Sequence, residues 1–184
     1  DRRRYIAARA RLRLLLAAEI EVAPQDLQFD YGPHGKPCLG GAFAKTGVHF
    51  NLSHSDDLAL VGVIRGVPLG VDLEATRPLA AHERLARRHF SRQEFSAYAA
   101  APLPQRAAAF FNCWTRKEAL LKAQGQSLAA AAAHATAPQQ SEWSSMNFDA
   151  APGFSAAVAV HRRNCDLKAE APASSRVRLG PDSA

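Results

Sequence analysis

The chain has 184 residues, 47% of them hydrophobic and 22% charged, which is the composition of a soluble globular protein long enough to bury a core. Its formal net charge of +6 predicts a surface that attracts phosphates, nucleic acid or an acidic protein, without choosing among them. No apolar run approaches the roughly 18 residues of a membrane span, so we expect no membrane partner.

The cysteines and the N-terminal segment indicate a cellular compartment. Cys38, Cys113 and Cys165 are odd in number and widely spaced, which favours neither a disulfide framework nor a zinc site and fits a reducing environment. The apolar run 14–18 is too short, and too closely flanked by arginine, for a signal sequence. We therefore expect a cytoplasmic protein.

Residues 4–20 have the apolar spacing of an amphipathic, basic helix. Arg9, Arg11 and Arg13 lie mostly off the apolar stripe. The predicted stripe consists of Tyr5, Ile6, Leu12, Leu15, Leu16 and Ile20.

Strands are predicted to follow this helix. A short strand ends at Gly32-Pro33, which cannot continue a ladder, and the chain is expected to go on as a loop through residues 35–37. Residues 48–53 alternate between apolar and polar side chains, as a half-buried strand does. Residues 58–64 and 69–74 predict two more strands. The helix and these strands would make a first α+β half.

A second half is predicted further along the chain. Ser91 and Glu94 have the spacing of a capping box, with Phe90 and Phe95 placed for a hydrophobic staple, so a helix should begin there. A longer helix is predicted over 105–123, with Gly125 at its C-terminal stop. Two closing strands are predicted over 141–148 and 154–162. The alanine-rich stretch 129–137 fits either helix or loop.

Two carboxylates stand out on the strand predicted at 69–74. Asp72 and Glu74 are two residues apart, so they project from one face while Val71 and Leu73 face the core. The pattern alone leaves two interpretations open. The pair belongs either to a solvated sheet face or to a site for a hard divalent cation such as Mg²⁺, which completes its shell with phosphates and water.

Glu118, Lys122 and Trp114 share a face of the long predicted helix because four residues separate each from the next. Glu118 and Lys122 could be a surface pair worth a few tenths of a kcal/mol. The aromatic neighbours favour instead a partly desolvated glutamate, whose basicity is raised unless a cation lies nearby. Lys117 points away by about 100° and is a weaker candidate.

The stretch 50–55 combines serine and histidine side chains. Neighbouring strand residues point to opposite faces, so His54 is poorly placed to deprotonate Ser53 or Ser55. His54 is then either a structural residue or a donor to phosphate or ribose. Lys36 lies between a glycine and a proline, on a stiff loop that could present its ammonium at a fixed place; solvated loop lysines are also common.

Five segments, taken in order, resemble the 4'-phosphopantetheinyl transferase superfamily, in its larger two-half, Sfp-like type. The segments are HGKPC, FNLSHS, GVDLE, RHFSRQEF and WTRKEALLKAQG. The resemblance spans about residues 4–160, and its most specific part is GVDLE followed by WTRKEALLK about 40 residues later.

This resemblance implies an α+β fold made of a pseudo-twofold pair of similar α+β halves, with the active site in the cleft between them. The first half would comprise residues 1–78 and the second 79–163, followed by a disordered tail at 164–184. Members of this type generally carry a strand before the first helix. Because this chain starts almost at that helix, we expect the N-terminal strand to be absent.

The resemblance also implies an enzyme that transfers the 4'-phosphopantetheine arm of coenzyme A to a serine of an apo acyl or peptidyl carrier protein and releases 3',5'-ADP. Glu118 as general base and Lys122 would be the catalytic residues. Mg²⁺, or Mn²⁺ in its place, would be ligated by Asp72, Glu74 and Glu118. Coenzyme A would be held by Arg4, Lys36, Pro37, Ser53 and His54, with Lys122 on its pyrophosphate.

The implied partner is an acidic carrier protein, which a basic surface would attract, and the implied state is a monomer. Two alternatives stay open. The first is a nucleic-acid-binding module based on the N-terminal arginines, which leaves the acidic residues unexplained, so we expect no nucleic acid partner. The second is a family member that binds coenzyme A or a carrier without turnover. The pathway of the carrier is not readable from the sequence.

Overall fold

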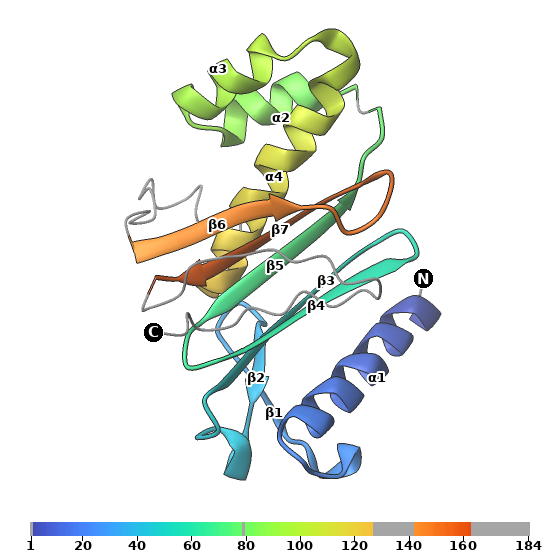
Figure 1. Ribbon diagram of the computed structural model, residues 1–184, viewed down its shortest axis with the longest axis vertical. Helices are drawn as coiled ribbons and strands as arrows, with labels where there is room; N and C mark the ends of the chain where they lie inside the picture. The colour runs from blue at the N-terminus through green and yellow to red at the C-terminus, as the bar shows by residue number, and fades with distance from the viewer. Residues whose placement is uncertain (1, 79, 127–141, 163–184) are drawn as a thin grey trace.

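The computed structural model describes residues 2–78, 80–126 and 142–162, without the side chains of Arg3 and Arg4 (Figure 1). Its helices are α1 (Arg2–Glu19), α2 (His82–His89), α3 (Arg92–Ala100) and α4 (Arg106–Ala123). Its strands are β1 (Phe29–Tyr31), β2 (Pro37–Leu39), β3 (Val48–Ser55), β4 (Leu58–Arg65), β5 (Leu69–Ala75), β6 (Trp143–Phe148) and β7 (Phe154–His161). The mixture of helices and sheets confirms the α+β class.

The strands form three hydrogen-bonded groups. β1 and β2 make one antiparallel hairpin, and β3 and β4 make another. The third group is the antiparallel sheet β5-β7-β6, in which Asp72 lies opposite Ala157. By its backbone pairing β5 therefore belongs with the later strands. The expected division of the chain at residue 78 stays a prediction.

β3 lies alongside β5 and is joined to it by side chains. Three polar side chains on one face of β3 accept hydrogen bonds from alternate main-chain N–H groups of β5. The pairs are Asn51 with Val71, Ser53 with Leu73 and Ser55 with Ala75, at 2.8, 3.3 and 3.0 Å. We call this row the β3–β5 ladder. Its constant offset of 20 residues aligns the two strands in parallel, and it satisfies N–H groups at the edge of the sheet.

The ladder corrects the expectation of a half-buried β3. Asn51, Ser53 and Ser55 are all buried, as are Val48 and Phe50 on the opposite face, so both faces of the strand are covered over most of its length. The alternation of apolar and polar residues is real. The polar side is buried because it supplies acceptors to β5 rather than facing water.

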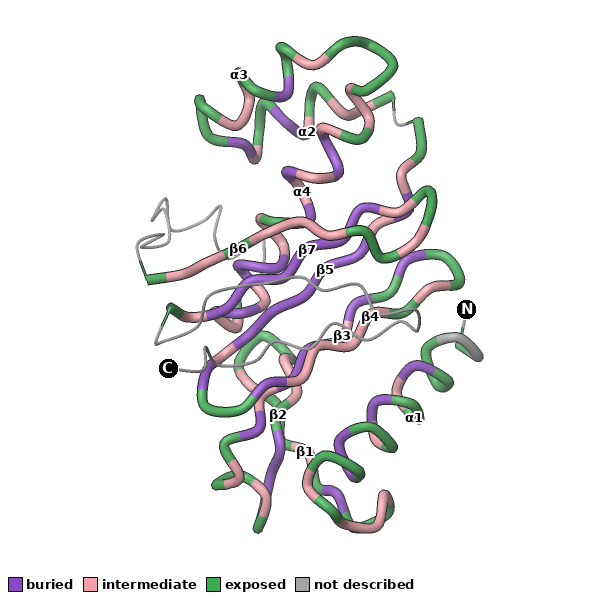
Figure 2. The backbone as a smooth tube through the Cα atoms, in the orientation of Figure 1, coloured by how far each residue is buried: buried purple, intermediate pink, exposed green. Residues whose placement is uncertain are grey.

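α1 covers the β3–β4 hairpin, with its burial confined to one side (Figure 2). Leu12 and Leu16 are its main contributions to a core that includes Phe50. The predicted stripe was too broad: Tyr5 and Ile6 are 47% and 55% exposed, and Leu15 is exposed as well. The apolar faces of β3 and β4 cover only a narrow strip of the helix.

Two further details differ from the sequence expectations. Pro37 opens β2 instead of lying in a loop, and it pairs in register with Tyr31. A proline is tolerated there because the first residue of a strand need not donate to a ladder. Helix α2 was not predicted at all. It is short, it has no side-chain cap, and Leu85 and Ala86 are its only apolar residues, so its sequence gives a weak helix signal.

α4 packs on β5 and β7 behind the three-stranded sheet, while α2 and α3 lie at its N-terminal end (Figure 1). Its inner face is made of small side chains, including Ala119 and Ala123, against Ala157 and Ala159 of β7. A Cβ on Gly70 would lie 2.1 Å from the Ala119 carbonyl oxygen, so the β5 backbone approaches the helix closely. These small residues bring the charged side chains of α4 next to those of β5.

The local signals for α3 and α4 are confirmed. Ser91 and Glu94 form the capping box of α3, and Phe90 and Phe95 belong to one aromatic cluster with Phe110 of α4. Gly125 has a φ of 69° just beyond the end of α4. The strands expected in 141–148 and 154–162 are confirmed as β6 and β7.

Several expectations fall on residues that the structure does not describe. These are the alanine-rich stretch 129–137 and the tail 164–184, both outside the described residues. Among the described residues, no helix is long and apolar enough to cross a bilayer. Cys38 and Cys113 are free thiols, and Cys165 lies outside the described part of the chain.

Candidate active site

Asp72 is a buried carboxylate with one satisfied oxygen and one unsatisfied oxygen. Its Oδ1 accepts hydrogen bonds from Ser53 Oγ at 2.9 Å and from Lys122 Nζ at 2.6 Å. Its Oδ2 is buried without a hydrogen-bond partner. Asp72 is only 3% exposed, so the interpretation as a solvated sheet face is wrong for this residue. A buried carboxylate oxygen is costly unless something binds it.

Glu74 lies two residues further along the same face of β5. Its Oε2 accepts a hydrogen bond from Ser55 Oγ at 3.1 Å. Burial and the nearby charge of Asp72 raise the pKa of Glu74, against the smaller opposing effects of Ser55, Lys122 and Arg77. The carboxylate therefore carries a negative charge that its surroundings only partly compensate.

Glu118 approaches the same region from α4. Burial raises its pKa to about 6, and the charge of Asp72 adds to this more than that of Glu74 does, while Lys122 opposes it. α4 packs on β5, and the charges of both β5 carboxylates act on Glu118. The partial desolvation expected for this glutamate is confirmed.

Lys122 does not form the surface pair with Glu118 that one interpretation allowed. Its ammonium forms an ion pair with Asp72 and also donates to Ser53 Oγ at 3.1 Å. Lys117 is held on the other side of the helix, where it donates to Glu94 Oε2 at 2.7 Å. Lys117 therefore braces α4 against the capping box of α3 and lies outside the carboxylate group.

The three carboxylates suit a hard divalent cation in their chemistry. Mg²⁺ prefers carboxylate oxygens, and the unpartnered Oδ2 of Asp72 together with the raised pKa of Glu74 and Glu118 indicates uncompensated negative charge. In their present positions, no three His, Cys, Asp or Glu side chains of the described residues already form a group that could hold a metal. Lys122 neutralises Asp72 in this arrangement.

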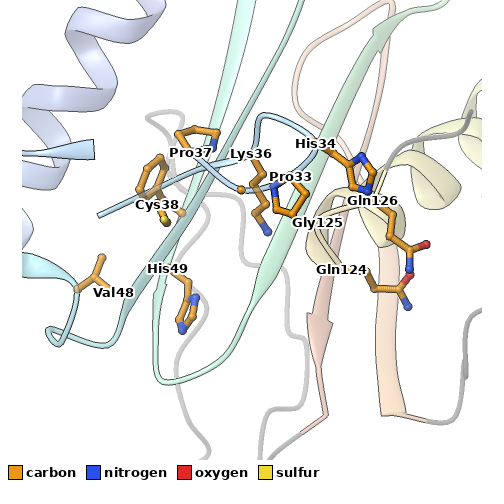
Figure 3. Close-up of a pocket in the computed structure, with 12 residues that line it drawn as sticks. Pro33, His34, Lys36, Pro37, Cys38, Val48, His49, Gln124, Gly125 and Gln126 are labelled. Carbon is orange, nitrogen blue, oxygen red and sulfur yellow. The ribbon is translucent and has the colours of Figure 1, made fainter. Parts of the chain in front are cut away.

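A pocket of about 410 Å³ lies between the β1–β2 hairpin, the start of β3 and the end of α4 (Figure 3). The three carboxylates and Lys122 are not among the residues that line it. Lys36 and Pro37 line this pocket. The resemblance implied that these two residues hold the nucleotide end of coenzyme A. Lys36 Nζ donates to the carbonyl oxygens of Leu69 and Ala123 at 2.9 and 3.2 Å. Burial lowers the pKa of Lys36 to about 8. Its ammonium thus braces β5 and α4 from within the pocket.

The other residues predicted to hold coenzyme A, which are Ser53, His54 and Arg4, lie in different surroundings. The Ser53 hydroxyl is fully used, since it donates to Asp72 and accepts from Leu73 and Lys122. His54 is exposed on the opposite side of β3, so the expectation that it cannot act as a base toward Ser53 is confirmed. The side chain of Arg4 lies outside the described residues.

Sequence reasoning missed several pocket residues. His34, His49, Gln124 and Gln126 line the pocket with Lys36. Figure 3 shows the Lys36 side chain between His49 and the segment that follows α4. Burial, and then the charge of Lys36, lower the pKa of His49. The sequence could have indicated His49, because it lies two residues before Asn51 on the polar side of β3.

The geometry defines an α+β protein with three coupled carboxylates, a lysine and a pocket at the end of α4. A family model of the 4'-phosphopantetheinyl transferase superfamily matches residues 68–166, which include all three carboxylates and Lys122. The chain belongs to the 4'-phosphopantetheinyl transferase superfamily, and its resemblance to the Sfp-like type is confirmed.

Three relatives illustrate the similarity. The chain is 44% identical over 128 residues to 4'-phosphopantetheinyl transferase HetI of Nostoc sp. (strain PCC 7120), covering 70% of this chain and 54% of that protein. It is 39% identical over 128 residues to 4'-phosphopantetheinyl transferase AcpT of Escherichia coli (strain K12), covering 68% and 60%. It is 27% identical over 128 residues to 4'-phosphopantetheinyl transferase Sfp of Bacillus subtilis (strain 168), covering 70% and 54%. The chain spans little more than half the length of these curated relatives.

Proposed function

We propose that this chain transfers the 4'-phosphopantetheine arm of coenzyme A to a serine of an apo acyl or peptidyl carrier protein, with Mg²⁺ as cofactor and 3',5'-ADP as the second product. Membership of the superfamily and the names of its relatives support the transferase activity. The observation that carries the proposal is the buried Asp72 with a free Oδ2, electrostatically coupled to Glu74 and Glu118.

Glu118 is the proposed general base. Its pKa of about 6 lies close to neutral pH, where a base can be ionised and still accept a proton. It would take the proton of the carrier serine as the serine oxygen forms a bond to the phosphorus next to pantetheine. The bond from that phosphorus to the 3',5'-ADP oxygen breaks, and 3',5'-ADP leaves with the bonding electrons.

Lys122 is the proposed partner of the diphosphate. Its ammonium already lies beside Asp72, in a partly buried position where a positive charge stabilises phosphoryl oxygens strongly. Asp72, Glu74 and Glu118 would hold Mg²⁺, or Mn²⁺ in its place, and the bound cation would neutralise charge on the diphosphate. The protein would thereby supply positioning and electrostatic stabilisation.

The pocket at the end of α4 is the proposed site for the nucleotide end of coenzyme A. Lys36 and Pro37 line it directly, and Ser53, His54 and Arg4 complete the proposed set. Since Lys36 already donates to two main-chain carbonyls, we propose that it contributes mainly by fixing the wall and by its positive charge. An acidic carrier protein, a monomeric state and a cytoplasmic location complete the proposal.

Intact-mass spectrometry of several apo carriers, incubated with the protein, coenzyme A and MgCl₂, tests the activity. We expect at least one carrier to gain the mass of a phosphopantetheine group, and Glu118→Gln to abolish this gain while coenzyme A binding is largely kept. Glu83→Gln is a matched control, because Glu83 is exposed and paired with Arg87 on α2. Full transfer by Glu118→Gln would remove Glu118 both as base and as metal ligand.

A further inference from the structure

Each of the two serines of the β3–β5 ladder joins a main-chain N–H of β5 to a carboxylate of β5 through its hydroxyl. Ser55 Oγ accepts from the N–H of Ala75 at 3.0 Å and donates to Glu74 Oε2 at 3.1 Å. Ser53 Oγ likewise accepts from the N–H of Leu73 and donates to Asp72 Oδ1. In both cases the carboxylate belongs to the residue just before the N–H donor on β5.

Asn51 makes the third rung of the ladder and differs in one respect. Its Oδ1 accepts from the N–H of Val71 at 2.8 Å. The residue before Val71 is Gly70, which has no side chain to receive a hydrogen bond. The alternation Asn-x-Ser-x-Ser on β3 thus matches the alternation Gly-x-Asp-x-Glu on β5, with hydroxyls opposite the two carboxylates only.

We propose that Ser55 is a positioning residue for the metal site, holding Oε2 of Glu74 and so fixing the carboxylate that would bind the cation. The inference rests on the proposed function, since it needs Glu74 as a ligand. The hydroxyl proton has a defined direction because the main-chain N–H of Ala75 occupies its acceptor side. Ser55 is itself buried, which shields its hydroxyl, and Glu74 is half-buried.

The test is the affinity of the 184-residue chain for Mn²⁺, measured by electron paramagnetic resonance with and without coenzyme A. Ser55→Ala removes both hydrogen bonds of the hydroxyl, and we expect about two- to tenfold weaker Mn²⁺ binding, the range for one lost hydrogen bond. Asn51→Ala is the matched control. It removes one rung without touching a carboxylate, and we expect it to lower the melting temperature similarly and leave Mn²⁺ affinity unchanged.

Two further comparisons separate positioning from general loss of structure. Ser55→Thr and Ser55→Val have one shape, with and without the hydroxyl, so only the threonine variant should bind Mn²⁺ like the wild type. On a Glu74→Gln background, Ser55→Ala should weaken binding no further, because its effect passes through Glu74. The comparison of Ser55→Thr with Ser55→Val stays informative even where Ser55→Ala itself folds poorly.

The inference is overturned if Ser55→Ala binds Mn²⁺ as tightly as the wild type, if Asn51→Ala weakens binding equally, or if the loss persists on the Glu74→Gln background. A wild-type chain that binds no Mn²⁺ overturns the inference together with the metal site. The proposed transfer fails separately: a chain that meets every expectation for Mn²⁺ but modifies no carrier loses the activity and keeps Ser55 as a positioning residue.

Discussion

The three carboxylates of the site differ in how their charges are compensated. Asp72 is paired with Lys122 and Ser53, and Glu74 is held by Ser55. Among the hydrogen bonds and ion pairs found in the described part of the chain, none joins Glu118 to a cation, and burial raises its pKa to about 6. A buried charge with little compensation costs stability, so Glu118 should destabilise the metal-free protein.

Replacing Glu118 should therefore stabilise the chain while it removes activity. Above pH 6 the glutamate is ionised in both folded and unfolded states, and its burial cost is fully present. In EDTA at pH 7.5 we expect Glu118→Gln to raise the free energy of unfolding by about 1–2 kcal/mol, the energy of a comparable pKa shift. Urea denaturation measures the difference.

The pH dependence supplies the control for this prediction. Below about pH 4.5 the glutamate is protonated in both states, so the advantage of Glu118→Gln should decline as the pH falls from 6 to 4.5 and then vanish. The exposed Glu83→Gln should show no such gain. A Glu118→Gln protein less stable than the wild type at pH 7.5 in EDTA would contradict the argument.

At the scale of elements, the C-terminal end of α4 connects the carboxylate group to the pocket. Lys122 lies in its last turn, and Gln124, Gly125 and Gln126 line the pocket just beyond it. The end is closed by two main-chain hydrogen bonds, from the Gly125 N–H to the Lys122 carbonyl and from the Gln126 N–H to the Leu121 carbonyl. This is a Schellman motif, in which the residue after the C-cap, here Gly125, has a left-handed backbone.

Gly125→Ala should weaken this helix end. The left-handed backbone at φ 69° disfavours a Cβ even though no atom within 4 Å would clash with it. We expect a loss of about 1 kcal/mol in the free energy of unfolding, measured by urea denaturation. Gly125→Asn is the matched control and should lose less, because asparagine tolerates this conformation. Equal losses for the two variants would show that backbone strain is not the cause.

For the whole molecule, the site depends on how closely α4 lies on β5. The β3–β5 ladder holds β5 on one side. On its other sides β5 contacts α4 and β7, and small residues let these two elements pack closely against each other. A Cβ on Gly70 would meet the Ala119 carbonyl oxygen at 2.1 Å and the Ala123 nitrogen at 2.3 Å. Only glycine allows the approach that brings Lys122 within 2.6 Å of Asp72.

Gly70→Ala should therefore damage both stability and function. The clash is with helix backbone, which cannot rotate away, so we expect a loss of about 3 kcal/mol and weaker Mn²⁺ binding as α4 moves outward. Gly62→Ala is the control, since its Cβ would meet side-chain atoms of Leu69 and Val71 and no backbone atom within 4 Å among the nearest contacts. Thermal and urea denaturation compare the two variants. A Gly70→Ala protein no less stable than Gly62→Ala would contradict this account.

Features that depend only on neighbouring residues could be predicted from the sequence. The period of a strand, the capping box at Ser91 and Glu94, and the glycine beyond α4 are local, because each is satisfied within a few residues of chain. The motif order predicted the superfamily in the same way. Helix α2 was missed because it has only 8 residues, no side-chain cap and few apolar residues, and it is held by packing.

Which faces are buried and which charges meet depends on contacts between elements that are far apart in the sequence. The polar side of β3 is predicted to face water from its pattern alone, yet it is buried because β5 lies beside it. Lys122 is four residues from Glu118 in sequence but pairs with Asp72, 50 residues earlier. Burial and electrostatic coupling depend on distances between elements, and these distances are set by packing, here above all by the missing side chain of Gly70.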